Sequence, residues 1–338
     1  MNSAPPVANG PNVMVTAIRR ALGEILAAGD NAVVLGPEVG AYGGLFRATS
    51  GLYERFGATR FVDVAANDLT SLGLARGFAW AGHMPIVELG PESAGRAAGA
   101  VAEDLGRMRA RGQTGPFIVR VPVAADATPE ALLEGVARVV TPSRPIDAWA
   151  MLIAASQATE PVVVLEPRAL YRQGGEVAAA DAVADPEVLC STRLAWPLAG
   201  EGGEGGEGGE ADDLVLVAWG AAVPVAVAVA EGLAADGYHA SVVDLRVLAP
   251  LDLEGVAARV RAAGRAVVVS EAGGALAGRV VAELQRAAFL SLEAPVVDVG
   301  GATTAADFVR EERHALARDD FSTWVAAVRA VAEATLFF

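Results

Sequence analysis

The sequence predicts an α/β protein whose parallel sheets are covered by helices on both faces. Short apolar runs alternate with longer alanine-rich stretches, and the runs lack the polar alternation of a half-exposed strand. Strands that are buried on both faces and joined by helical crossovers give this pattern. The strand candidates are 32–35, 85–89, 117–121, 162–165, 214–218, 241–245, 266–270 and 295–299. The helix candidates are 15–28, 72–81, 94–111, 146–156, 223–235 and 253–263.

Length and composition narrow the class further. A chain of 338 residues with 53% apolar residues is long enough for two domains of ~150 residues each, and too apolar for a disordered chain. The net charge of -15 argues against a nucleic-acid surface. No signal peptide and no apolar run of ~18 residues is present, so we expect a cytoplasmic protein without a membrane span. Cys190 is the single cysteine, which excludes an intramolecular disulfide, and we expect it to be buried.

A low-complexity segment marks the boundary between the domains. Gly200–Glu210 reads GEGGEGGEGGE, and neither glycine nor evenly spaced glutamate packs into a core, so we expect a flexible, extended loop. A cation-binding tract is the alternative interpretation. We predict a first domain over 1–185, a linker over 186–213 and a second domain over 214–338.

Three stretches carry a family resemblance. Val33–Gly57 reads VVLGPEVGAYGGLFRATSGLYERFG, Glu160–Arg172 reads EPVVVLEPRALYR, and Val243–Asp252 reads VDLRVLAPLD. In this order they resemble signature motifs of the beta subunits of thiamine-diphosphate-dependent 2-oxo acid dehydrogenases of the pyruvate dehydrogenase type. The resemblance runs from about Met14 to Ala330.

The residues of these motifs also have plain structural interpretations. Gly40, Gly43 and Gly44 suit positive φ or a close backbone approach in the loop after the first strand. Asp244 and Arg246 lie on either side of a strand end, where an exposed ion pair contributes little stability. Without the resemblance, all three motifs would be interpreted as structural turns.

The resemblance implies a fold, a cofactor and a partner. The fold would be a transketolase-like pyrimidine-binding domain followed by a transketolase C-terminal α/β domain. The chain would bind the pyrimidine half of thiamine diphosphate, while an alpha-type subunit binds the diphosphate and magnesium through a Gly-Asp-Gly motif that this sequence lacks. The expected assembly is an alpha2beta2 heterotetramer that serves a lipoyl or acyl-carrier protein, with the site at the interface between unlike subunits.

Asp68 is the candidate catalytic residue. The family has a glutamate that binds the cofactor's pyrimidine nitrogen, in a stretch that resembles Asp63–Ala79, and its position falls on Asp68. The aspartate carboxyl is set back by roughly 1.5 Å, about one carbon–carbon bond, and a misplacement on that scale can cost ~100-fold in rate. The alternative is that Asp68 caps a helix that starts near Leu69. The predicted cofactor-binding residues are Asp68, Asn67, Glu38, Leu89 and Gly90.

Other family features are missing. Pro37 replaces a glutamate that takes part in proton exchange. The neighbouring Glu38 is a candidate substitute, and the alternative is that its side chain points elsewhere, because adjacent strand residues face opposite sides. Gly90 follows Leu89 where the family has an aromatic residue against the pyrimidine. A histidine-bearing loop after Pro122 is deleted. None of His83, His239 and His314 matches a family catalytic position or a metal-ligand spacing.

Two functions remain open. In the first, the chain is a working subunit of an enzyme that transfers an acyl or two-carbon unit from a 2-oxo acid or a ketose, with secondary metabolism as the favoured setting. In the second, it is a catalytically degenerate architectural subunit that keeps the fold and the partner contacts. The carboxyl at Asp68 favours the first, and the missing features favour the second.

Overall fold

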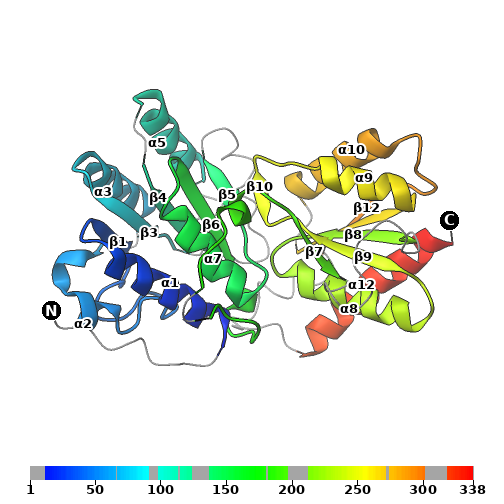
Figure 1. Cartoon of the computed structure of the whole chain (residues 1–338), viewed down its shortest axis with the longest axis horizontal. Helices are drawn as coiled ribbons and strands as arrows, with labels where there is room; N and C mark the ends of the chain where they lie inside the picture. Colours follow the sequence, from blue (N-terminus) through cyan, green and yellow to red (C-terminus); the bar gives the residue numbers. More distant parts are fainter. Residues whose placement is uncertain are drawn as a thin grey trace. The chain divides into compact units, whose positions relative to one another are not determined.

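The computed structural model describes residues 12–65, 67–90, 98–112, 115–123, 137–179, 182–196, 212–271, 274–300 and 318–337. The chain divides into two compact units, drawn in Figure 1. The first comprises Met1–Cys190 and Val247–Pro250, and the second comprises Ser191–Arg246 and Leu251–Phe338. The division falls inside the segment that was predicted to be the linker, and a short segment of the second half returns to the first unit. No helix among the described residues is both long and apolar enough to cross a bilayer.

The first unit is built on a seven-stranded sheet of order β10-β5-β6-β4-β3-β1-β2. Its strand pairs are parallel except for the pair of β10 with β5. The residues of the central strands are fully buried, as predicted for strands covered on both faces. The strands are β1 (Ala32–Gly36), β2 (Phe61–Asp63), β3 (Met84–Glu88), β4 (Phe117–Val123), β5 (Arg138–Val140), β6 (Pro161–Pro167) and β10 (Val247–Ala249).

Helices cover both faces of this sheet. α1 packs against α7 on one face, and α3 packs against α5 on the other, which is the arrangement that right-handed crossovers produce for this strand order. The helices are α1 (Met14–Ala28), α2 (Leu52–Phe56), α3 (Asp68–Trp80), α5 (Ala98–Ala110) and α7 (Pro145–Ala155), with the 3-10 turns η1 (Ala58–Arg60), η2 (Arg168–Leu170) and η3 (Pro186–Leu189).

The second unit has a five-stranded sheet of order β12-β11-β8-β9-β7, parallel except for the pair of β7 with β9. α8 packs against α12, and α9 packs against α10. The strands are β7 (Arg193–Trp196), β8 (Leu214–Ala218), β9 (Ala240–Asp244), β11 (Ala266–Ser270) and β12 (Val297–Gly300), and the helices are α8 (Ala222–Ala235), α9 (Glu254–Ala263), α10 (Ala275–Ala288) and α12 (Arg318–Leu336). The predicted α/β class is therefore confirmed.

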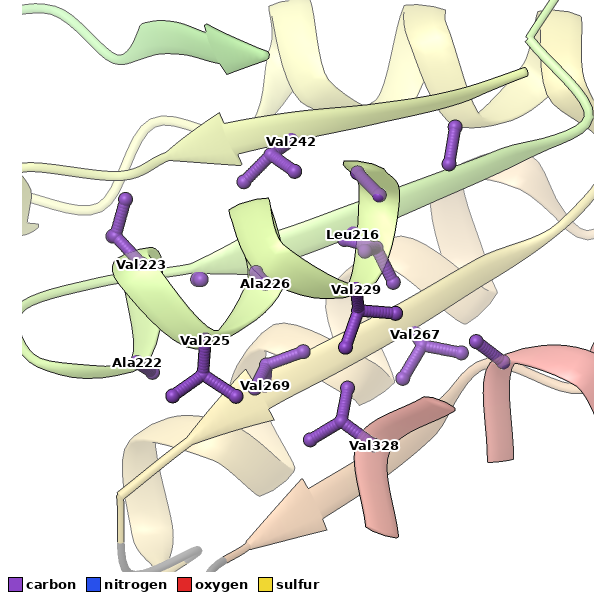
Figure 2. Packing of buried hydrophobic residues seen from close by; sticks show 14 of the residues in the cluster. Leu216, Ala222, Val223, Val225, Ala226, Val229, Val242, Val267, Val269 and Val328 are labelled. Atoms are coloured by element: carbon purple, nitrogen blue, oxygen red, sulfur yellow. The ribbon is translucent and has the colours of Figure 1, made fainter. Parts of the chain in front are cut away.

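Valine side chains fill the core of the second unit. Figure 2 shows Val225 and Val229 of α8 between the strands and α12, where Val267 and Val328 meet them. All four are fully buried. Burying one such side chain stabilises the fold by about 1.5–3 kcal/mol, so this small cluster accounts for much of the attachment of α8 to its sheet.

Four short strands were not predicted: β2, β5, β7 and β10. They have only three or four residues each, too few to show a periodic pattern. Cys190 was expected to be buried, but it is exposed because it lies in the turn that ends η3.

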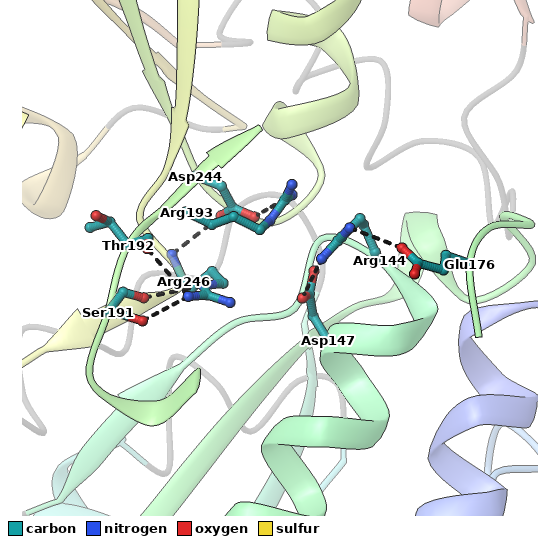
Figure 3. Close-up of polar contacts among 8 residues, drawn as sticks. All are labelled: Arg144, Asp147, Glu176, Ser191, Thr192, Arg193, Asp244 and Arg246. Atoms are coloured by element: carbon teal, nitrogen blue, oxygen red, sulfur yellow. Dashed lines mark hydrogen bonds and ion pairs between the residues drawn. The ribbon is translucent and has the colours of Figure 1, made fainter. Parts of the chain in front are cut away.

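The third motif differs from its prediction as well. Asp244 is completely buried, and its carboxylate accepts from the Arg193 guanidinium at 3.1 Å and from the Arg246 backbone N–H at 3.2 Å (Figure 3). Arg246 has a φ of 51° and donates to the Ser191 hydroxyl at 2.8 Å and to the Thr192 carbonyl at 3.3 Å. The expected exposed ion pair is therefore wrong: this motif ties the end of β9 to the segment that enters the second unit.

Candidate functional site

The strand order of the first unit places a candidate site at the carboxyl ends of β1 and β3. β1 is bordered by β2 on one side and by β3 on the other, and the later strands β4 and β6 lie on the β3 side. The connection after β1 therefore runs to β2 on one side, and the connection after β3 runs to β4 on the other. In open α/β sheets, ligands bind outside the carboxyl ends of the strands at such a reversal. The segments after Gly36, Asp63 and Glu88, the last residues of β1, β2 and β3, border the site.

The loop after β1 is held in an unusual backbone conformation. Gly43 and Gly44 both have a φ of 79°, as predicted from the motif. Glu38 and Arg47 also have positive φ values, 56° and 65°, although neither is a glycine. Such residues cost about 1–3 kcal/mol each and cluster at functional sites, so this loop, residues 37–51, is a credible binding element.

The loop is tied to the end of β2 by a close backbone approach. The Gly40 N–H donates to the Asp63 carboxylate at 2.8 Å. A Cβ at Gly40 would lie 2.8 Å from the second carboxylate oxygen of Asp63, so a larger residue would have to displace that side chain. Gly40 therefore allows the close approach of the loop to the end of β2.

Asp68 is the first residue of α3 and not its cap. The Asn67 side chain caps the helix by accepting from the Thr70 N–H at 3.1 Å. The interpretation of Asp68 as the cap is therefore wrong. The half-buried Asp68 carboxylate instead lies 3.5 Å from the Gly90 N–H, across the site.

The predicted binding residues fall into two groups. Asp68 and Gly90 are brought together by the ends of α3 and β3, and Asn67 precedes Asp68 with its side chain engaged as the cap. Leu89 has a buried side chain, and Glu38 has an exposed one while its carbonyl accepts from the Gly44 N–H at 2.7 Å.

Two of the three histidines lie within the described residues. His83 and His239 lie between a helix and the following strand, as predicted. His314, Pro91 and Glu92, and the shortened segment after Pro122 from 124 to 136, fall outside the described residues.

The sequence interpretation missed a buried ionic cluster beneath the loop. The Arg120 guanidinium donates to both oxygens of Glu166, at 2.7 and 2.8 Å, and to Glu88 at 2.7 Å. Glu166 also accepts from the Tyr171 hydroxyl. The signal was visible, because a charged residue interrupts each of the apolar runs of β3, β4 and β6. We call these four residues, Glu88, Arg120, Glu166 and Tyr171, the Arg120 cluster.

Burial and the neighbouring charges shift the pKa values of groups in the Arg120 cluster. Burial raises the pKa of Glu88, and the adjacent Arg120 partly offsets that shift. Burial acts to lower the pKa of Arg120, but the carboxylates of Glu166 and Glu88 raise it, so the guanidinium stays charged. Burial, followed by the charge of Glu166, raises the pKa of Tyr171. The cluster therefore contains a fixed cation that both carboxylates share.

The comparisons first give the class of fold, which is transketolase-like. Residues 203–318 match the family of transketolase C-terminal domains. A solved split-gene transketolase, described as an inactive beta4 tetramer, superposes with a TM-score of 0.63 at 20% identity and covers 95% of this chain and 99% of its own. This likeness shows the fold.

Sequence relatives give the family. The chain is 36% identical to the pyruvate dehydrogenase E1 component subunit beta of Bacillus subtilis, over 88% of this chain and 92% of that protein. It is 34% identical to the same subunit of Leifsonia xyli, over 86% of each. The chain belongs to the family of pyruvate dehydrogenase E1 component beta subunits, which form part of thiamine-diphosphate-dependent 2-oxo acid dehydrogenases, and this confirms the resemblance seen in its motifs.

Proposed function

We propose that this chain is the beta-type subunit of a heteromeric thiamine-diphosphate enzyme that transfers an acyl or two-carbon unit from a 2-oxo acid or ketose to a lipoyl or carrier-protein arm. The observation that carries the proposal is the position of Asp68. Its carboxyl opens α3 at the strand-order reversal, faces Gly90, and is not consumed by helix capping. A carboxyl that is firmly placed and free to exchange a proton is what acid–base work at a pyrimidine nitrogen requires.

The residues present fit the pyrimidine half of the cofactor. Asp68 would bind the pyrimidine nitrogen and hold the shared proton there, while Gly90, whose backbone N–H lies beside that carboxyl, has no side chain of its own. Thiamine diphosphate, when bound, supplies the carbon nucleophile, and the protein contributes binding, orientation and this proton. We assign the diphosphate and magnesium to an alpha-type partner in an alpha2beta2 assembly.

The helix that begins at Asp68 also supports a partner. On α3, Leu69 is 62% exposed and Trp80 is 53% exposed, although both are large and apolar. Gly73 and Gly77, on the same helix, have open space where a side chain would stand. Apolar surface next to a candidate site is typical of a region that another subunit covers.

Replacing Asp68 in the assembled enzyme tests the proposal. With the alpha-type partner present, Asp68→Ala should abolish cofactor-dependent turnover, because no other carboxyl faces Gly90 among the described residues. Asp68→Glu restores the longer family side chain and should retain turnover. The matched control is Thr70→Ala, which changes an exposed side chain in the same turn of α3 and keeps the backbone N–H that Asn67 caps. Unchanged turnover in Asp68→Ala would favour the alternative, an architectural subunit without catalytic function.

A further inference from the structure

The Arg120 cluster has two ends with different surroundings. At one end, Glu166 binds Arg120 and the Tyr171 hydroxyl within the interior of the first unit. At the other end, Glu88 binds Arg120 through Oε2 and turns Oε1 toward the loop after β1. Glu88, Arg120 and Glu166 are each at most 1% exposed.

Glu88 contacts the loop directly. Its Oε1 accepts from the Leu45 N–H at 3.3 Å. A Cβ at Gly44 would lie 2.8 Å from the same oxygen, so the loop backbone is seated against the carboxylate. Gly44 in turn donates its N–H to the Glu38 carbonyl at 2.7 Å, which carries the contact toward the strained start of the loop.

Arg120 also contacts the end of β3, which forms the other border of the candidate site. Its side chain fixes Glu88 at 2.7 Å, and its carbonyl accepts from the Leu89 N–H at 3.0 Å. Leu89 is followed by Gly90, whose N–H faces Asp68. One buried pair thus sets both the loop after β1 and the end of β3.

A buried ion pair contributes little net stability to a sheet, because removing its charges from water costs free energy. Apolar residues of the same volume often serve as well or better, so such pairs are better explained by the geometry that they impose. Here the geometry is imposed on the borders of the site, and the carboxylate of Glu88 is the point where the cluster and the loop meet.

We propose that Glu88, fixed by Arg120, is a positioning residue that sets the loop after β1 and the Leu89–Gly90 strand end for the pyrimidine half of the cofactor. This inference rests on the proposed function. It predicts that a disturbance of Glu88 changes recognition of the pyrimidine and leaves recognition of the diphosphate unchanged.

The test compares two ligands in the assembled alpha–beta pair. The glutamine in Glu88→Gln has one acceptor oxygen, so it satisfies either Leu45 or Arg120 but not both. Its dissociation constant for thiamine diphosphate should rise about tenfold or more, because a buried hydrogen-bonding group left unsatisfied has a cost of that size. Its affinity for inorganic diphosphate with magnesium should not change. Gly44→Ala disturbs the same contact from the loop side, because its Cβ would crowd the Glu88 carboxylate, and should have the same effect.

Tyr171→Phe is the matched control. It removes a hydroxyl from the far end of the cluster while keeping the ring that contacts Phe46, so it should bind both ligands as the wild type does. An unchanged affinity for thiamine diphosphate in folded Glu88→Gln and Gly44→Ala would overturn the inference, as would an equal loss for both ligands. If Asp68→Ala binds thiamine diphosphate like the wild type, the proposed role of Asp68 is wrong. The role of Glu88 is decided separately, by the affinities of Glu88→Gln and Gly44→Ala. A wild-type pair that does not bind the cofactor would refute both proposals.

Discussion

Removing the cation of the Arg120 cluster should destabilise the first unit sharply. Arg120→Met keeps the approximate length of the side chain but deletes three hydrogen bonds of 2.7–2.8 Å to two buried carboxylates. Breaking a buried ion pair by deleting one partner costs about 3–5 kcal/mol, because the remaining charge is buried without compensation. At about 1.4 kcal/mol for each factor of ten, this is a change of about 100-fold to a few thousand-fold in the unfolding equilibrium.

Amide hydrogen exchange followed by mass spectrometry measures this change locally. Peptides from β3, β4 and β6 should exchange faster in Arg120→Met by that factor, whereas peptides from β8 and β11 of the second unit serve as an internal control. The triple variant Arg120→Met, Glu88→Gln, Glu166→Gln should recover much of the protection, since it no longer buries unpaired charge.

The loss of stability of the first unit in Arg120→Met should also depend on pH. Without the guanidinium, burial raises the folded-state pKa of Glu88 further above its unfolded value, so the stability that depends on its protonation is present at low pH and is lost as pH rises. The difference from the wild type should therefore be smaller at about pH 5 than at about pH 8. Equal exchange in the wild type and Arg120→Met at pH 8, or a triple variant no better than the single one, would refute the reasoning.

Two further predictions concern single residues. Burial raises the pKa of Glu271 to about 7 from its ordinary value of 4.5, so its contribution to stability is present below about pH 4.5 and is lost as pH rises through about 7. The stability gained from Glu271→Gln should therefore be larger at pH 8 than at pH 5. The difference should be at most about 3 kcal/mol, because one pKa unit is worth about 1.4 kcal/mol. Thermal unfolding of the variant and the wild type at the two pH values checks this, and an equal gain in stability at both would contradict it. Asn67→Ala should lose about 1 kcal/mol with its helix cap, measured as a lower midpoint of thermal unfolding, and an unchanged midpoint would show that another group caps α3.

Most of the fold was predictable because its signals are local. The buried strands of both sheets show as short apolar runs, and the helices between them show as alanine-rich stretches of the right length. β2, β5, β7 and β10 were missed because strands of three or four residues are defined by their partners, which lie far away in the sequence.

The site was predictable only in part. Asp68 was found through a resemblance of motifs, but its local sequence could not decide between capping and catalysis; Asn67, one residue earlier, has the capping role. The Arg120 cluster was missed because its members are separated by up to 83 positions if counted from Glu88 to Tyr171, and only the sheet register brings them together. A charged residue inside a buried apolar strand was nevertheless a usable signal, because such a charge needs a partner.

Binding of thiamine diphosphate tests the central claim most directly. Calorimetric titration with thiamine diphosphate and magnesium should be done on this chain alone, on its pair with the alpha-type subunit, and on the pair that carries Asp68→Ala. We predict binding by the pair, none by this chain alone, and a clear loss of affinity in the variant. Binding by the isolated chain as tight as binding by the pair, or no binding by the pair, would contradict the assignment of a cofactor site shared between two subunits.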